Sequence, residues 1–388
     1  MTDPTTKRPA PRAAEEPASH GASQRRAATS QDRIRMGILG AGRIADLQVL
    51  GYLEHPKVEI VAVCDRDPAL VRARAAAWGA AHAYTNAEQL FADPDVDAID
   101  VLTPHHLHAE HAIAALEAGK HVSLQKPPTR TLEELDRVAA AAARSGRLLR
   151  IFENFAYYPP HRKAKELIDA GAIGVPLSVR VKTAGGRPDR GWQVGLSSLA
   201  WRMNREACGG GPTTFDHGYH CFQMGRHFIP AEVERVHAFI HWSRIGEDAW
   251  YDGPALISWK YAGAVPRYGS WEVIASLGMA VRSKYYVSDD RLEIHGTEGI
   301  LWVNRCTGQL LDEPSLVLYR EGETRAFHEL PADWADSFRL GTRDFADALL
   351  EGRACFQDVA DARKTLAFAL AAAKSAAEAR EVPLAEIG

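Results

Sequence analysis

The chain has 388 residues, of which 46% are hydrophobic and 25% charged, and its formal net charge is −4. It is long for one hydrophobic core, so two domains are expected, and the absence of a basic block argues against nucleic acid as its main partner. No apolar run approaches the roughly 20 residues that cross a bilayer, so a membrane protein is not expected.

The five cysteines are scattered and form no C-x-x-C pair. This pattern favours reduced thiols, and therefore the cytoplasm, over a disulfide or zinc framework. Residues 1–31 are rich in Ala, Pro, Ser, Thr and Arg and contain almost no large apolar side chains. Such a segment buries too little surface to offset the entropy of ordering, so a disordered tail is predicted.

A short apolar strand begins at Ile34 and runs directly into Gly40-Ala41-Gly42-Arg43-Ile44-Ala45. This is a G-x-G-x-x-A pattern between a strand and a helix that is expected to end near Pro56. Gly40 allows the tight turn and Gly42 lets the backbone approach a pyrophosphate. The backbone at Arg43 and Ile44, where the helix begins, then offers N–H groups to the phosphates.

The next predicted strand, residues 58–63, ends at Cys64-Asp65. A carboxylate at this position accepts hydrogen bonds from the adenosine ribose and repels a 2′-phosphate, so Asp65 favours NAD. Arg66 keeps NADP open as the alternative, because an adjacent arginine can accommodate the extra phosphate.

A further buried strand, residues 97–102, leads into Thr103, Pro104, His105 and His108. The clustered histidines invite a metal interpretation, but no carboxylate or thiolate set accompanies them at ligand spacing. We therefore predict a helix start that faces the cofactor, with no metal.

Lys126 follows the apolar run 121–124 and Gln125, at the point where a buried strand ends in a turn. Glu153 and Asn154 end the next strand, 148–152, in the same way. Strands and helices alternate from residue 34 to about 154, which predicts a parallel sheet whose carboxyl edge holds the ligands. Lys126 is then the expected meeting point of cofactor and substrate.

After about residue 155 the predicted strands no longer alternate with helices. A helix is predicted at about 160–170, and strand-like runs separated by turn residues predict a large, mostly antiparallel open sheet. The runs are 177–183, 233–242, 255–261, 270–277, 291–295, 300–303 and 315–319. The many aromatic residues of this sheet suggest that it pairs with another subunit. From about Trp334 the chain is alanine-rich, and the helices predicted there are expected to pack back on the fold. The α/β chain thus divides into tail (1–31), dinucleotide-binding domain (32–154), substrate and oligomerisation domain (155–332) and C-terminal helices (333–388).

Between the first two of those runs lies Gly209-Gly210-Gly211-Pro212, followed by Asp216 and His220. Pro212 suits a first helical turn. If a regular helix continues, Asp216 and His220 are four residues apart and share a face. The ordinary alternative is a local ion pair on an amphipathic helix.

Taken together, these residues resemble the Gfo/Idh/MocA oxidoreductases, the family of glucose-fructose oxidoreductase and inositol dehydrogenase. The marks are Gly40 to Ala45, Thr103-Pro104 with His108, the run 118–122 leading to Lys126-Pro127, and Gly209 to Gly211 with Asp216 and His220. The resemblance implies an N-terminal Rossmann domain and a C-terminal α/β domain whose open sheet forms dimers or tetramers. It also implies sugar or cyclitol substrates and makes Arg202 a substrate-side residue. The family usually has Glu where this chain has Gln125.

Oxidation of a secondary alcohol sends a hydride to the nicotinamide and a proton to a base. His220 is the candidate base, with Asp216 holding its ring, because a histidine with a free pKa of about 6.5 suits that task. Lys126 orients the hydroxyl and stabilises the alkoxide or, if desolvated, takes the proton itself. Glu153 and Arg202 are further substrate contacts, and Phe155, Tyr157, Tyr158 and Trp192 are candidate stacking surfaces. The rivals are transient oxidation without net redox and a non-catalytic NAD-binding sensor.

Overall fold

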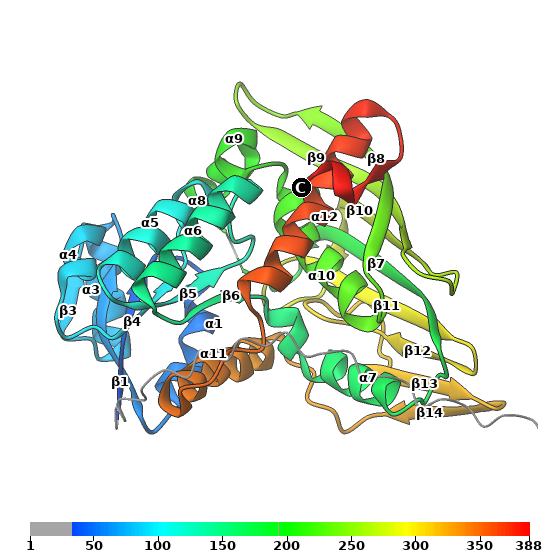
Figure 1. The fold of residues 1–388 in the computed structure, drawn as a ribbon, viewed down its shortest axis with the longest axis horizontal. Coiled ribbons are helices and arrows are strands. Elements are labelled where there is room, and N and C mark those ends of the chain that lie inside the picture. The colour runs from blue at the N-terminus through cyan, green and yellow to red at the C-terminus, as the bar shows by residue number, and fades with distance from the viewer. Residues whose placement is uncertain (1–32, 193) are drawn as a thin grey trace, which may run out of the picture.

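The computed structural model describes residues 33–192 and 194–388, so the predicted tail 1–31 lies outside the described residues. Two β-sheets with their helices make up this part of the chain (Figure 1). Among the described residues, no helix is both long and apolar enough to cross a membrane.

The first sheet has six strands in the order β3-β2-β1-β4-β5-β6, and all of its pairs are parallel. This is the strand order of dinucleotide-binding folds, with a switch point between β1 and β4. The strands are β1 (Ile34–Leu39), β2 (Val58–Cys64), β3 (His82–Tyr84), β4 (Ala98–Val101), β5 (His121–Gln125) and β6 (Leu149–Phe152).

The helices of this half are α1 (Ala45–Gln48), α2 (Leu50–Leu53), α3 (Pro68–Trp78), α4 (Ala87–Ala92), α5 (His105–Glu117) and α6 (Leu132–Ser145). The helix expected to end near Pro56 is therefore two short helices. Thr131 caps the start of α6, because its Oγ1 accepts a hydrogen bond from the Glu134 N–H at 3.1 Å.

The second sheet has nine strands in the order β14-β13-β12-β11-β7-β10-β9-β8-β15. They are β7 (Pro176–Pro188), β8 (Val233–Arg244), β9 (Trp250–Tyr261), β10 (Tyr268–Val281), β11 (Ser288–Gly296), β12 (Gly299–Val303), β13 (Leu316–Arg320), β14 (Glu323–Phe327) and β15 (Val382–Pro383). Only the β7–β10 pair is parallel. The predicted fold class is confirmed, while the short edge strands β14 and β15 were not predicted.

Helices cover one face of the second sheet: α10 (Gly218–Phe228) contacts β7 and β10, α7 (Pro159–Asp169) contacts β12, and α12 (Val359–Glu378) contacts β8. α11 (Trp334–Glu351) instead packs against α1, α2 and β1 of the first half. The two C-terminal helices thus touch both halves (Figure 1).

The chain between β7 and β8 forms α8 (Leu196–Met203), α9 (Arg205–Cys208) and η2 (Pro212–His217), which leads into α10. The expectation of a regular α-helix from Pro212 is wrong. η2 is π-helical, and the Asp216 N–H donates to the Gly211 carbonyl five residues earlier at 3.1 Å. Buried Asp252 accepts hydrogen bonds from the Thr213 and Thr214 N–H groups at 2.8 and 2.6 Å. Only glycine fits at 211, because a Cβ there would lie 1.9 Å from Asp252 Cγ.

Candidate active site

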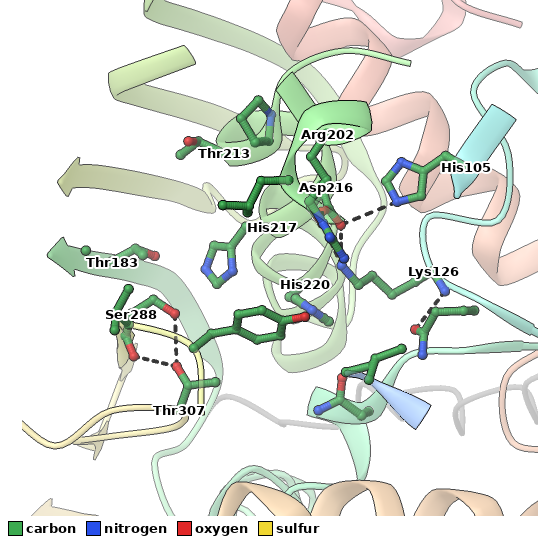
Figure 2. Close-up of a pocket in the computed structure, with 18 of the residues that line it drawn as sticks. His105, Lys126, Thr183, Arg202, Thr213, Asp216, His217, His220, Ser288 and Thr307 are labelled. Atoms are coloured by element: carbon green, nitrogen blue, oxygen red, sulfur yellow. Dashed lines mark hydrogen bonds and ion pairs between the residues drawn. The ribbon is translucent and has the colours of Figure 1, made fainter. Parts of the chain in front are cut away.

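A cavity of about 300 Å³ lies between the carboxyl edge of the parallel sheet and the helix-covered face of the second sheet. Lys126 enters it from the end of β5, Asp216 from η2 and His220 from α10 (Figure 2). The cavity wall includes ten of the predicted site residues, namely Ile44, Thr103, His105, His108, Gln125, Lys126, Asn154, Arg202, Asp216 and His220. The other predicted residues, namely Gly40, Gly42, Arg43, Asp65, Arg66, Pro104 and Glu153, lie outside its wall.

Asp216 is the centre of a charged cluster. Lys126 Nζ donates to its Oδ1 at 2.7 Å and to its backbone carbonyl at 2.9 Å. Arg202 Nε donates to Oδ2 at 2.9 Å, and His105 Nε2 lies 3.5 Å from Oδ1. Burial alone raises the pKa of Asp216, but Lys126, His105 and Arg202 outweigh burial and hold this pKa well below its usual range. The carboxylate therefore stays ionised and fixes the ammonium of Lys126.

The predicted pairing of Asp216 with His220 is wrong. His220 Nδ1 lies 2.6 and 2.7 Å from the two carboxylate oxygens of Glu153, and its ring stacks on Phe155 at 4.1 Å. In the wider π-helical turn, residues i and i+4 do not align as they do in an α-helix, so Asp216 points to Lys126 instead.

Burial lowers the pKa of His220 to about 4, although Glu153 acts in the opposite direction. At neutral pH the ring is therefore uncharged and donates its Nδ1 proton to Glu153. Its Nε2 has no hydrogen-bond partner among the described residues, so the lone pair stays available.

The glycine turn after β1 fits the phosphates of a dinucleotide. Gly40 has φ of 97°, and a Cβ there would lie 2.8 Å from the Leu102 carbonyl oxygen. Space is open next to Gly42, because a Cβ there would meet no atom within 4 Å. The N–H groups of Gly42, Arg43 and Ile44 donate to no group in the described part of the chain and thus remain available to phosphate oxygens.

Asp65 stands beside this turn, where its Oδ2 accepts a hydrogen bond from the Ala41 N–H at 2.8 Å. Its carboxylate is thereby held at the end of β2, where the ribose of NAD is expected. The neighbouring Arg66 is exposed.

The side chains expected near the nicotinamide are fixed by hydrogen bonds to other groups of the protein. His108 lies between the carbonyls of Pro127 and Thr103 at 2.9 and 2.7 Å, and burial lowers its pKa to about 3. Gln125 Oε1 accepts the Lys126 N–H at 2.9 Å, and Asn154 Nδ2 donates to Ser337 Oγ at 2.8 Å. The His108 and Gln125 contacts thus hold the turn after β5 that carries Lys126.

A fourth histidine of the cavity wall, His217, was missed. Its Nε2 lies 2.9 Å from Asp290 Oδ1, which also accepts a hydrogen bond from Thr183 Oγ1 at 2.6 Å. Burial lowers the pKa of His217, but Asp290 outweighs burial and raises it. The adjacent Asp216-His217 pair was the only sequence signal for this residue.

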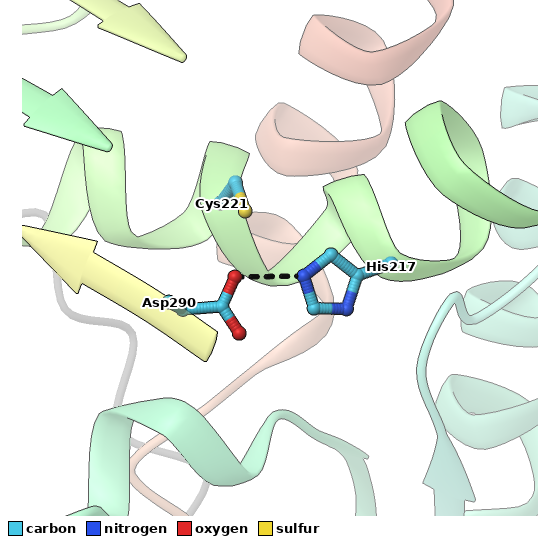
Figure 3. A group of neighbouring side chains, drawn as sticks. All are labelled: His217, Cys221 and Asp290. Atoms are coloured by element: carbon cyan, nitrogen blue, oxygen red, sulfur yellow. Dashed lines mark hydrogen bonds and ion pairs between the residues drawn. The ribbon is translucent and has the colours of Figure 1, made fainter. Parts of the chain in front are cut away.

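His217, Cys221 and Asp290 could together hold a metal ion, since their ligand atoms lie within 4.8 Å of one another (Figure 3). Their contacts are those of an ion pair, however, because the imidazole and Thr183 already share the carboxylate. Burial raises the pKa of the Cys221 thiol well above its usual value, so no thiolate is formed in advance.

Three of the four predicted stacking aromatics lie elsewhere. Tyr157 and Tyr158 are buried, with their hydroxyls bonded to Asp344 and the Ala332 carbonyl, and Trp192 packs on neighbouring tyrosines. Of these four only Phe155 lines the cavity, together with Trp201, which the resemblance had placed with Arg202 on the substrate side, and the unpredicted Tyr251, Tyr286, Trp334 and Phe338. Local sequence carries no signal for the unpredicted aromatic residues, because their strands and helices meet only in the folded chain.

Comparison with known proteins gives two family matches. A family model described as an oxidoreductase family with an NAD-binding Rossmann fold matches residues 34–153, and the GFO/IDH/MocA C-terminal domain matches residues 161–302. The chain is 30% identical over 315 residues to a 1,5-anhydro-D-fructose reductase of Ensifer adhaerens, which covers 81% of this chain and 88% of that protein.

Two further relatives have names that describe ring compounds. A 1-carboxy-3-chloro-3,4-dihydroxycyclohexa-1,5-diene dehydrogenase of Comamonas testosteroni is 39% identical over 141 residues, 36% of each chain. The structure of levoglucosan dehydrogenase with NADH and levoglucosan has a TM-score of 0.75 and 25% identity, covering 90% of this chain and 99% of that one.

The geometry and the two domain matches indicate the same kind of protein. The structure has a glycine turn beside Asp65 and has Lys126 at the end of β5, as expected for the matched NAD-binding domain. The residues at the turn fit NAD, and relatives of the chain are sugar-related dehydrogenases and reductases. The chain belongs to the Gfo/Idh/MocA family of NAD-binding oxidoreductases.

Proposed function

We propose that this chain moves a hydride between NAD and a secondary hydroxyl or keto carbon of a sugar, sugar derivative or cyclitol. The observation that carries the proposal is that the ammonium of Lys126 and the imidazole of His220 face one cavity (Figure 2). NAD, when bound, supplies the hydride acceptor.

In this proposal Lys126 orients the substrate hydroxyl. An ammonium group has three N–H donors, and two of them already point at the carbonyl and carboxylate of Asp216. The third is left for the substrate oxygen, where the positive charge stabilises the developing alkoxide. We assign the proton-accepting role to His220, because its Nε2 lone pair has no hydrogen-bond partner among the described residues.

His220 Nε2 then takes the hydroxyl proton as the C–H hydride leaves, and Glu153 stabilises the imidazolium that results. Glu153 thus acts through His220 as a positioning residue rather than as a substrate contact. Asp216 and Arg202 are the proposed groups that position Lys126 and the substrate.

The substrate class rests on the relatives, whose names refer to an anhydro sugar, a dihydroxylated ring and levoglucosan. Three aromatic side chains of the cavity wall, Trp201, Tyr286 and Trp334, offer apolar surface of the kind that packs on sugar rings.

The test is a panel of sugars, glycosides and cyclitols with NAD or NADP, in which absorbance of the reduced cofactor is followed. With the best substrate, His220→Asn should lower kcat by about 10² to 10⁴. His328→Asn, which changes an exposed histidine, is the matched control. Wild-type turnover by the His220 variant contradicts the assignment, and product without accumulated NADH indicates transient oxidation instead.

We also propose a cytoplasmic homo-oligomer that forms through the outer face of the second sheet. Phe239, Leu256 and Ile274 lie in one groove there and are 64%, 48% and 52% exposed. Exposed apolar side chains gathered in this way are typical of an interface. Leu256→Glu should reduce the mass found by light scattering, and an unchanged mass argues against this interface. The cytoplasmic location is supported by the five free cysteines.

A further inference from the structure

A second pocket, of about 570 Å³, lies beside the catalytic cavity, and Thr307 and Trp334 line both. Four segments build it: the turn between β10 and β11, the loop after β12, the approach to α11, and the chain just after β7, which contributes Arg190. The first two are joined, since Ser283 Oγ donates to the Thr307 carbonyl at 3.1 Å and the Gln309 N–H donates to the Arg282 carbonyl at 2.8 Å. We call it the Arg305 pocket.

The wall of the Arg305 pocket carries an excess of positive charge. Arg190, Arg282, Lys284 and Arg305 line it, and Asp333 is the only acidic residue among its described lining residues. That carboxylate is already engaged, because Lys284 Nζ lies 2.7 Å from it and the Tyr285 hydroxyl donates to its other oxygen at 2.6 Å.

None of the three arginines has a counter-ion in the part of the chain that the structure describes. Within the described ranges, the guanidinium groups of Arg190, Arg282 and Arg305 form neither a hydrogen bond nor an ion pair, and Arg305 Nε is buried without an acceptor. Buried Asp289 lies against Gly308 but outside the pocket wall, and its carboxylate is 3.5 Å from Arg291 Nε rather than from a pocket arginine.

A partly buried guanidinium without a partner is unfavourable, and its planar set of donors matches the oxygens of phosphate or carboxylate groups. Several such groups around one hollow attract an anion more strongly than a lone surface arginine does.

We propose that the Arg305 pocket binds a phosphate or carboxylate group next to the active site. The group belongs either to the substrate itself, whose ring lies in the adjoining cavity, or to a free anion. Because Thr307 and Trp334 line both the pocket and the catalytic cavity, a substrate bound in the cavity can extend a charged group into the pocket.

The test measures binding of inorganic phosphate to the NAD-saturated full chain by calorimetry, because NAD then fills the other phosphate site at the glycine turn. One phosphate per chain should bind saturably. Arg305→Gln and the exposed Arg282→Gln should each weaken binding at least tenfold, and the exposed Arg72→Gln on α3 should leave it unchanged. Absence of saturable binding, or equal binding by all three variants, overturns the proposal. Because heat is measured and not turnover, this result does not depend on the proposed function.

A competition experiment then identifies the source of the anion, and this arm does rest on the proposed function. If phosphate competes with a carboxylated or phosphorylated sugar but not with the neutral parent sugar, the pocket binds a charged substituent of the substrate. Phosphate that binds without competing with either assigns it to a free anion.

Discussion

Glu153→Gln tests the proposed proton transfer most directly, because it removes one charge and keeps the shape of the side chain. Glu153 is 2% exposed, and its carboxylate accepts hydrogen bonds from His220 Nδ1 and the Phe155 N–H. The amide oxygen of glutamine can still accept the Nδ1 proton. The substitution therefore removes the charge that stabilises the imidazolium formed during catalysis.

The expected loss follows from the strength of the two hydrogen bonds. A bond to a charged partner contributes about 1.5–3 kcal/mol and a neutral one about 0.5–1.5 kcal/mol. The difference of about 1–2 kcal/mol applies mainly to the transition state, where the ring is charged, and corresponds to a fall in kcat of roughly 5- to 30-fold. KM should change little, since Glu153 does not line the cavity.

The assay combines a double-mutant cycle with a pH profile. Glu153→Gln should lower kcat of the wild type but have little further effect on His220→Asn. In the wild type, kcat/KM should fall as the pH drops below the pKa of His220, which is about 4. Because the charge of Glu153 raises that pKa, the acid limb of the variant should move to lower pH. An equal loss in both backgrounds, or a limb that moves to higher pH, refutes the reasoning.

Three further predictions concern the cofactor, the π-helical turn and acid stability. Asp65→Asn keeps an acceptor for the Ala41 N–H but removes the charge that repels a 2′-phosphate, so the NADP-to-NAD ratio of kcat/KM should rise about tenfold, and an unchanged ratio contradicts this role. The Asp252 carboxylate accepts hydrogen bonds from two backbone N–H groups, and Asp252→Asn turns an NH₂ group toward one of these donors. The free energy of unfolding measured in urea should therefore fall by about 1–3 kcal/mol. Burial lowers the pKa of His161 from 6.5 to about 4 in the folded chain. As the pH drops, the unfolded chain therefore binds this proton before the folded chain does, and the free energy of unfolding decreases between about pH 6.5 and 4. His161→Gln should remove about 3 kcal/mol of this pH-dependent loss, and an unchanged slope of unfolding free energy against pH argues against it.

Local sequence predicted the half of the site that belongs to the parallel sheet. The glycine turn, Asp65 and Lys126 each follow a recognisable strand, and a parallel sheet brings the carboxyl ends of its strands to one edge. That Lys126 and Asp216, 90 residues apart, belong to one site was expected from the family resemblance, but their direct contact was not predicted.

The pairing of His220 with Glu153, by contrast, was decided by tertiary structure. Helical spacing pointed to Asp216, but the turn at Pro212–His217 widens around buried Asp252, and the histidine meets a carboxylate at the end of β6 instead. Periodicity reports which residues share a face of a regular element. It cannot report an irregular turn, or a contact between segments that only packing brings together, and the His220–Glu153 pair depends on both.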